Sequence, residues 1–304
     1  MSSKPIYVES FVDASVQDVW EHTQQPDVHQ LWDARFTEIN YLPKEEDEPQ
    51  RFTYSTTVLP GFKVGGLGES IGERHREDGT AYSGLKFWSD HPISLIKTGS
   101  GFWRYVPHDD GVRFLTKYDY QVRWGPFGRL IDRFLFRPVF GWGTAWSFDR
   151  LRLWIEQGIH PAQSRNLTVI NILATVTLAL VWFYQGLVPK ILFPDAGEAQ
   201  LFEAATSFDA QPYALIILGL AEMLFGLLIL IFWKKRWPFM LNVVAMVPLA
   251  LGGLLGDGLA FVRPFNPVSL NLSLLVLALI SLFANQNLPS GKLPLRKSPE
   301  GGSK

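Results

Sequence analysis

Hydrophobic and polar positions divide the chain into two halves of different character. The second half contains four long apolar runs, over residues 167–189, 212–233, 237–262 and 268–284. Helices on the surface of soluble domains carry a polar stripe along one side, and none of these runs has one. Because a helix needs about 20 apolar residues to cross the hydrocarbon core of a bilayer, we predict four transmembrane helices rather than the core of a soluble helical domain.

The first half alternates between apolar and polar residues, as strands with one buried face do. The clearest case is 111–124, where most even positions from Val112 to Trp124 are apolar or aromatic. Residues 6–12 are predicted to form a strand, and two short helices broken at Pro26 follow it. Further strands separated by turn residues come next, and a long helix is predicted over 127–157. The expected order is one strand, two short helices, an antiparallel run of strands and one long helix.

This order, with the Trp20…Pro26…Trp32 region that leads into the second strand, resembles the START / birch-pollen-allergen superfamily, also called SRPBCC. The resemblance covers about residues 4–158. It implies an α+β helix-grip domain over residues 1–160, in which a curved antiparallel sheet wraps around the long C-terminal helix and leaves an apolar cavity between them. The aromatic residues expected to bind a ligand in that cavity are Trp103, Phe114, Tyr118, Tyr120, Trp124, Phe134 and Trp146.

The second half has a resemblance of its own. The FYQGLVPK segment that ends at Lys190, the GLAE segment that ends at Glu222, and Trp237-Pro238 at the start of the third run are similar to the DoxX-like family. The similarity covers about residues 166–287 and implies an all-α four-helix transmembrane bundle. Members of the wider family have been linked to quinone-coupled sulfur oxidation and to oxidative-stress complexes. Residues 288–304, after the bundle, are expected to be a disordered basic tail.

Two ionisable residues lie inside the apolar runs. Glu222 is near the middle of the second run, and Asp257 is near the end of the third. A charge in a bilayer is costly unless it is paired or neutralised, so such residues are candidates for function. One interpretation is structural: Glu222 hydrogen-bonds across the bundle, and Asp257 pairs with Arg263 or Lys190. The other is a ligand or proton site, for which the candidate polar residues are Glu222, Asp257, Gln185, Lys190, Arg263, Asn266 and Asn271.

Lysine and arginine are concentrated on alternate sides of the apolar runs. They precede the first run, occupy the loop between the second and third, and follow the fourth, whereas the other two loops hold only Lys190 and Arg263. Loops rich in these residues stay in the cytoplasm. We therefore expect a multi-pass protein of the bacterial inner membrane, in contact with the lipid bilayer and with both termini cytoplasmic.

Composition narrows the chemistry further. The chain has no cysteine, which excludes thiolate metal sites and thiol nucleophiles, and its net charge of −1 gives no reason to expect a nucleic-acid partner. All six histidines lie at or before His160, so a bis-histidine haem inside the membrane is excluded. No metal site is expected and no cofactor is evident, although a bound quinone is possible if the bundle takes part in electron transfer.

These observations favour a binding protein over an enzyme, and they identify no catalytic residue. The preferred hypothesis is that the first domain binds an apolar or amphipathic small molecule beside the bilayer. The alternatives are an accessory, quinone-binding subunit that serves a membrane redox partner, and a non-catalytic membrane scaffold. Arg129, Arg133 and Arg137 repeat every four residues along the predicted long helix, as a solvated stripe or as contacts to anionic headgroups.

Overall fold

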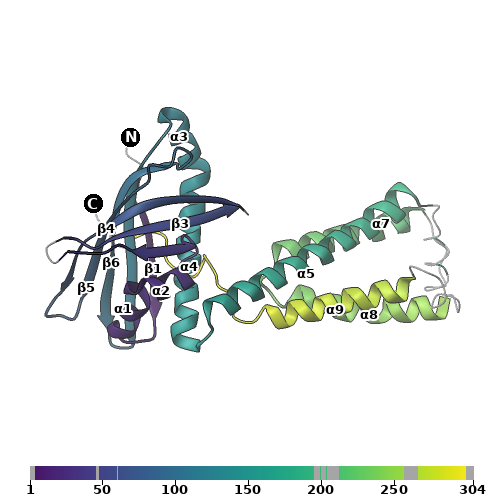
Figure 1. Cartoon of the computed structure of the whole chain (residues 1–304). Coiled ribbons are helices and arrows are strands. Elements are labelled where there is room, and N and C mark those ends of the chain that lie inside the picture. Colours follow the sequence, from purple (N-terminus) through teal and green to yellow (C-terminus); the bar gives the residue numbers. More distant parts are fainter. Residues whose placement is uncertain are drawn as a thin grey trace, which may run out of the picture. The chain divides into compact units, whose positions relative to one another are not determined.

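The structure is a computed structural model, and it describes residues 4–45, 48–59, 61–194, 212–256 and 266–298, together with positions 199 and 203. The chain divides into two compact units (Figure 1). The first contains the residues up to Ser164 and those from Pro289 onward, and the second runs from Arg165 to Leu288.

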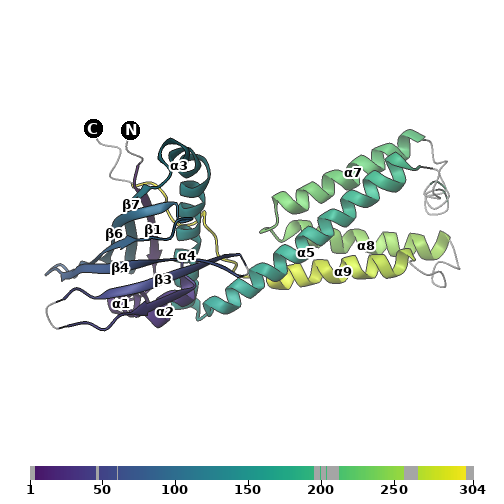
Figure 2. The ribbon, with the colours of Figure 1, turned by 45° about the horizontal axis from the view of Figure 1, so that its top comes forward.

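The first unit contains a seven-stranded antiparallel sheet in the order β1-β7-β6-β5-β4-β3-β2, which curves across the view of Figure 2. Two short helices, α1 and α2, connect β1 to β2. The strands are β1 (Ile6–Val12), β2 (Glu38–Tyr41), β3 (Arg51–Leu59), β4 (Phe62–His75), β5 (Ala81–Trp88), β6 (Ile96–His108) and β7 (Gly111–Val122).

Local sequence signals explain where these elements begin and end. Helix α1 (Val16–Gln24) starts with a capping box in which the Ser15 hydroxyl accepts from the Asp18 amide at 3.1 Å. Pro26 is the first residue of α2 (Pro26–Trp32), where its missing N–H removes no helical hydrogen bond. Gly111 starts β7, and a Cβ there would lie 2.3 Å from the Val12 carbonyl oxygen. A side chain at that position would therefore separate β1 from β7.

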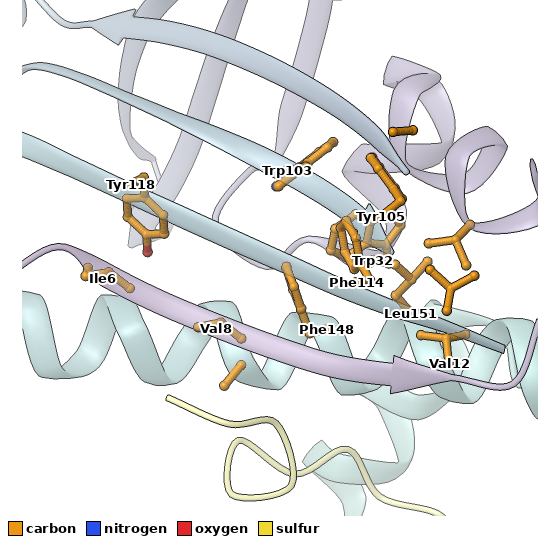
Figure 3. Packing of buried hydrophobic residues seen from close by; sticks show 14 of the residues in the cluster. Ile6, Val8, Val12, Trp32, Trp103, Tyr105, Phe114, Tyr118, Phe148 and Leu151 are labelled. Atoms are coloured by element: carbon orange, nitrogen blue, oxygen red, sulfur yellow. The ribbon is translucent and has the colours of Figure 1, made fainter. Parts of the chain in front are cut away.

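A long helical segment packs against the concave face of the sheet. It consists of α3 (Gly125–Ile131), the π-helical turn η1 (Asp132–Phe136) and α4 (Arg137–Gln157). The core lies between α4 and the strands, and Figure 3 shows Phe148 of α4 directed at the β-sheet residues. The Phe114 and Phe148 rings stack with centroids 4.5 Å apart. This confirms the predicted α+β fold, a curved antiparallel sheet with a long C-terminal helix.

The chain after the last membrane helix returns to the first unit. Glu9 of edge strand β1 and Leu295 exchange two backbone hydrogen bonds, of 2.9 and 2.8 Å. The Ser290 amide donates to Asp149 Oδ2 at 2.7 Å, and Arg296 donates to the Pro138 carbonyl at 3.2 Å. The structure therefore differs from the predicted disordered tail over 289–298, because β1 offers an unpaired backbone edge that this segment covers.

The second unit is helical. Its elements are α5 (Pro161–Leu187), which starts in the first unit, η2 (Val188–Leu192), α7 (Pro212–Ile231), α8 (Trp237–Gly256) and α9 (Pro267–Ala284). Among the described residues, three helices are long and apolar enough to span a membrane, Pro161–Leu192, Tyr213–Ile231 and Pro267–Ala284. Within the described part of α8, the apolar stretch Trp237–Leu249 is shorter than these three. Inside the bundle, Trp182 Nε1 donates to Asn242 Oδ1 at 2.7 Å, which satisfies a fully buried amide.

Candidate functional site

Four of the aromatic residues predicted to bind a ligand lie together in the first unit. Trp103, Phe114, Tyr118 and Tyr120 are all buried between the sheet and α4. They pack against one another and against α4, with Trp103 and Phe114 ring centroids 5.8 Å apart and the Tyr118 hydroxyl 2.7 Å from Thr144 Oγ1. Aromatic rings therefore fill the middle of the interface between sheet and helix (Figure 3).

The other three predicted residues lie elsewhere. Trp124 is 44% exposed and Phe134 is 69% exposed, while Trp146 is half-buried and stacks on Trp142. The alternation of apolar and polar residues predicted that Trp124 faces inward, but β7 ends at Val122. Trp124 instead adopts a left-handed backbone conformation as the N-cap residue of α3. Phe134 lies in η1, where the π-helical turn changes the direction of successive side chains.

Beside this packed core is an open groove of about 1280 Å³, lined by one end of β5–β7 and by α3 and η1. Part of its lining is apolar: Val122, Pro126, Leu130 and Phe134. Another part is basic: Lys4, Lys86, Arg129, Arg133 and Arg137. Asp119 and Asp132 are its acidic residues. The groove thus combines an apolar wall with an excess of positive charge.

Arg137 forms ion pairs with both acidic residues of the groove. Its guanidinium donates to Asp132 Oδ2 at 2.9 Å and to Asp119 Oδ1 at 3.1 Å, and it lies 4.4 Å from the centre of the Tyr120 ring. The Tyr120 hydroxyl donates to Asp132 Oδ1 at 2.7 Å. Burial, and then this hydrogen bond, raise the pKa of Tyr120, so the phenol stays protonated. With both carboxylates occupied, the remaining lysine and arginine side chains give the groove a net positive potential.

A second polar cluster, which the sequence analysis did not single out, lies in the core. Asp33, which is fully buried, accepts from Arg35 Nε at 2.9 Å and Nη2 at 2.5 Å and faces His29 Nε2 at 3.0 Å. The guanidinium of Arg35 lies 5.4 Å from the centre of the Tyr118 ring, and the His29 ring meets Trp103 edge-on. The Asp-Ala-Arg sequence after α2 resembles an ordinary solvated turn, so no sequence signal distinguishes this cluster.

Burial and charge act in opposite directions on this cluster. Burial by itself would raise the pKa of Asp33, but the Arg35 charge and the hydrogen bonds from Arg35 and His29 hold it well below its ordinary value. Burial lowers the pKa of His29, against the opposing effect of Asp33. At neutral pH the cluster is therefore an Asp33–Arg35 ion pair with a neutral histidine beside it.

In the second unit, Glu222 of α7 pairs with Lys190 of η2 at 3.1 Å. Lys190 also donates to the Gln185 carbonyl at 3.3 Å. Helices α5 and α7 approach closely where both carry glycine, since a Cβ on Gly186 would lie 2.3 Å from the Gly219 carbonyl oxygen. The structural interpretation of the sequence offered Arg263 or Lys190 as the partner of Asp257, and the structure pairs Lys190 with Glu222.

Two of the other predicted polar residues of the bundle lie at or in α9. The Asn266 side chain caps α9 by accepting from the Ser269 amide at 2.9 Å, and Asn271 is half-buried on the same helix. Asp257 and Arg263 lie outside the described residues. Among the residues predicted for the membrane site, the structure therefore brings together Gln185, Lys190 and Glu222.

A known membrane protein shares much of this sequence. The uncharacterized membrane protein YndG of Bacillus subtilis (strain 168) is 46% identical over 187 residues, which are 61% of this chain and 70% of YndG. The chain belongs to the YndG family. Within the YndG-family chain, residues 179–279 match the model of the DoxX-like family, which confirms that resemblance. The matched region includes both Lys190 and Glu222.

Solved structures similar to this YndG-family protein cover its first half. A protein from Thermus thermophilus is 17% identical, covers 51% of this chain and 98% of its own, and has a TM-score of 0.39. A STAR-related lipid transfer protein fragment from Xanthomonas axonopodis is 19% identical over 50% of this chain and 85% of its own, also at 0.39. Human StAR-related lipid transfer protein 5 is 16% identical over 50% and 74%, at 0.37.

Proposed function

We propose that the first unit of this membrane protein binds an amphipathic small molecule with an anionic head in the groove beside β7. The observation that carries the proposal is the lining of the groove, which is apolar along Val122 and Leu130 and basic at Lys86 and Arg133. Ligand sites are commonly concave, mostly apolar and supplied with a few convergent polar groups. The groove volume of about 1280 Å³ accommodates a molecule with a short acyl chain or a fused-ring system.

Charge favours an anionic head over a neutral or cationic one. Arg137 pairs with both Asp119 and Asp132 and balances one of their two charges. The four other basic residues of the lining outnumber the carboxylate charge that is left, so the groove attracts an incoming anion. Among the described residues, no ion pair joins Lys86 or Arg133 to a carboxylate, and both can donate charge-assisted hydrogen bonds to a ligand. A cationic amphiphile would meet their repulsion instead.

The membrane helices hold this unit close to a bilayer, which is a source of amphipathic molecules. We further propose that the unit lies in the cytoplasm, because basic residues are concentrated in the loops on its side of the spans. A single cysteine at Ser298 should then resist an impermeant maleimide in intact cells, and one at Ala205 should react. The opposite labelling would place the groove on the outer side.

The binding proposal can be tested on the full chain in nanodiscs of phosphatidylcholine. The probes are 2-naphthalenesulfonate and the neutral 2-naphthalenemethanol, which share a ring system and differ in charge. We expect measurable binding of the sulfonate and much weaker binding of the alcohol by titration calorimetry. Lys86→Glu should weaken sulfonate binding about tenfold or more, the scale of one charge-assisted hydrogen bond. Thr98→Trp, which fills the groove from an exposed position, should abolish it.

The matched control is Lys97→Glu, which makes the same charge change one position from Thr98 but outside the groove lining. It should leave sulfonate binding unchanged. Equal affinity for the two probes would contradict the anionic specificity, and binding that survives both groove variants would contradict the site itself.

A further inference from the structure

The segment from Trp124 to Val139 exposes an unusual amount of apolar surface for a soluble unit. Phe127 is 65% exposed and Leu135 is 62% exposed, and Leu130, Phe134 and Val139 are also more than half exposed. Within α3 and η1 only Gly128 and Asp132 are buried. Phe136 and Asp132 hold the segment against the end of β7, and most of its other side chains point away from the sheet. Figure 1 shows α3 at one end of the sheet.

The exposed charges on this segment are all positive. Arg129 and Arg133 are exposed between the apolar side chains. The acidic residue of the segment, Asp132, is buried and is held by Tyr120 and Arg137. Its exposed surface is thus built from large apolar side chains and arginines, without an exposed carboxylate.

We propose that residues 124–139 form an interfacial segment that docks on the surface of an anionic bilayer. Helices that lie in the membrane interface combine exposed Phe, Leu and Trp with basic residues, and they bind through buried apolar area together with attraction to anionic lipids. Large exposed apolar patches on soluble units mark interaction sites. Charge selects lipid as the occupant here, because Arg129 and Arg133 complement phosphate headgroups.

Chain connectivity tethers the segment to a bilayer through α4, which separates it from the first candidate span by about 30 Å of helix. Helix α4 ends at Gln157, and α5, the first candidate membrane span, begins at Pro161. A membrane-anchored segment meets the lipid surface at a high effective concentration, so modest intrinsic affinity is enough for docking. The cytoplasmic leaflet, towards which positive residues are retained, also carries the anionic lipids.

This docking does not depend on occupancy of the groove. Several residues belong to both surfaces, Arg129, Leu130, Arg133 and Phe134 among them, but Phe127, Leu135 and Val139 do not line the groove. Those residues allow docking to be tested separately from ligand binding.

The test uses the full chain, which has no native cysteine. Single cysteines at Phe127 and Leu135 carry a nitroxide, with a control label at Asp109 in the turn between β6 and β7. Each variant is reconstituted in nanodiscs of phosphatidylcholine alone or mixed with phosphatidylglycerol. Collision of the nitroxide with oxygen, which enriches in acyl chains, is compared with collision with a water-soluble nickel chelate.

We expect the ratio of oxygen to nickel accessibility at both segment positions to rise several-fold when phosphatidylglycerol is present. The Asp109 label should not change, and Arg129→Glu combined with Arg133→Glu should remove the rise. Labels that remain open to nickel in the anionic discs would overturn the proposal. Labels shielded from both reagents equally in both lipids would also overturn it, because they would show packing on protein, either the helical unit or a second copy.

Discussion

Removing the charge of Asp33 tests whether the core of the first unit contains a buried ion pair. Asp33 has no exposed side-chain surface and Arg35 only 9%, so Asp33→Asn leaves a guanidinium charge enclosed without its counter-ion. Breaking one side of a buried pair costs about 3–5 kcal/mol, because the remaining charge has lost both water and partner. A domain has only about 5–15 kcal/mol of stability. We therefore expect the first unit of the variant to be close to unfolding.

A local probe is needed because the protein has two units and need not unfold in one step. A cysteine at Ala145, buried in the core on α4, can react with a thiol reagent only when the first unit opens. In mild urea, with the full chain in detergent, Asp33→Asn should raise the labelling rate by two to nearly four powers of ten, since about 1.4 kcal/mol corresponds to a factor of ten when opening is at equilibrium.

Two companion variants separate charge from packing. Glu69→Gln removes the partner of Arg51 in an exposed pair and should change stability by no more than about 1 kcal/mol. Asp33→Leu combined with Arg35→Met removes both buried charges and should be less destabilising than Asp33→Asn alone. If Asp33→Asn labels at the wild-type rate, or the double variant is worse than the single, the assignment of a buried ion pair is wrong.

Three further predictions concern His29, the segment that pairs with β1, and the Lys190–Glu222 pair. The lowered pKa of His29 means that the unfolded chain takes up its proton first, so stability should fall as pH drops below 6.5 and His29→Gln should flatten that slope in urea titrations. Truncation after Leu288 removes the segment on β1 and should destabilise the first unit by about 2–4 kcal/mol in the same labelling assay, on the scale of its hydrogen bonds. Lys190→Met should lower the melting temperature in detergent strongly, and adding Glu222→Leu should recover much of it.

A specific result would contradict each of these three predictions. An unchanged pH slope in His29→Gln would mean that another group titrates. Normal stability after truncation would mean that residues 289–298 do not contribute to the first unit. A double Lys190/Glu222 variant no better than the single would mean that helix packing at Gly186 and Gly219, rather than an uncompensated charge, dominates the loss.

Sequence periodicity was sufficient to predict the order of helices and strands in the first unit and the apolar helices of the second unit. The alternation along β7 and the break at Pro26 are local properties, readable within one turn or strand. The family resemblance over the second half is likewise carried by short segments around Lys190 and Glu222, and the DoxX-like match confirms it. The resemblance of the first half also implied the fold, and it implied a ligand cavity between the sheet and the long helix.

Only the tertiary structure decided where polar groups meet. Lys190 and Glu222 lie in different helices, and Tyr120 meets Asp132 and Arg137 only because η1 folds across the end of β7. Trp124 and Phe134 point outward because the strand ends at Val122 and a π-helical turn follows, neither of which alters the hydrophobic pattern. The return of Leu295 to β1 is decided in the same way, because pairing along a strand edge depends on backbone groups that every sequence carries. Periodicity in the sequence indicates which face of a helix or strand is buried. The candidate binding groove and the ion pairs depend instead on which other elements pack against that face.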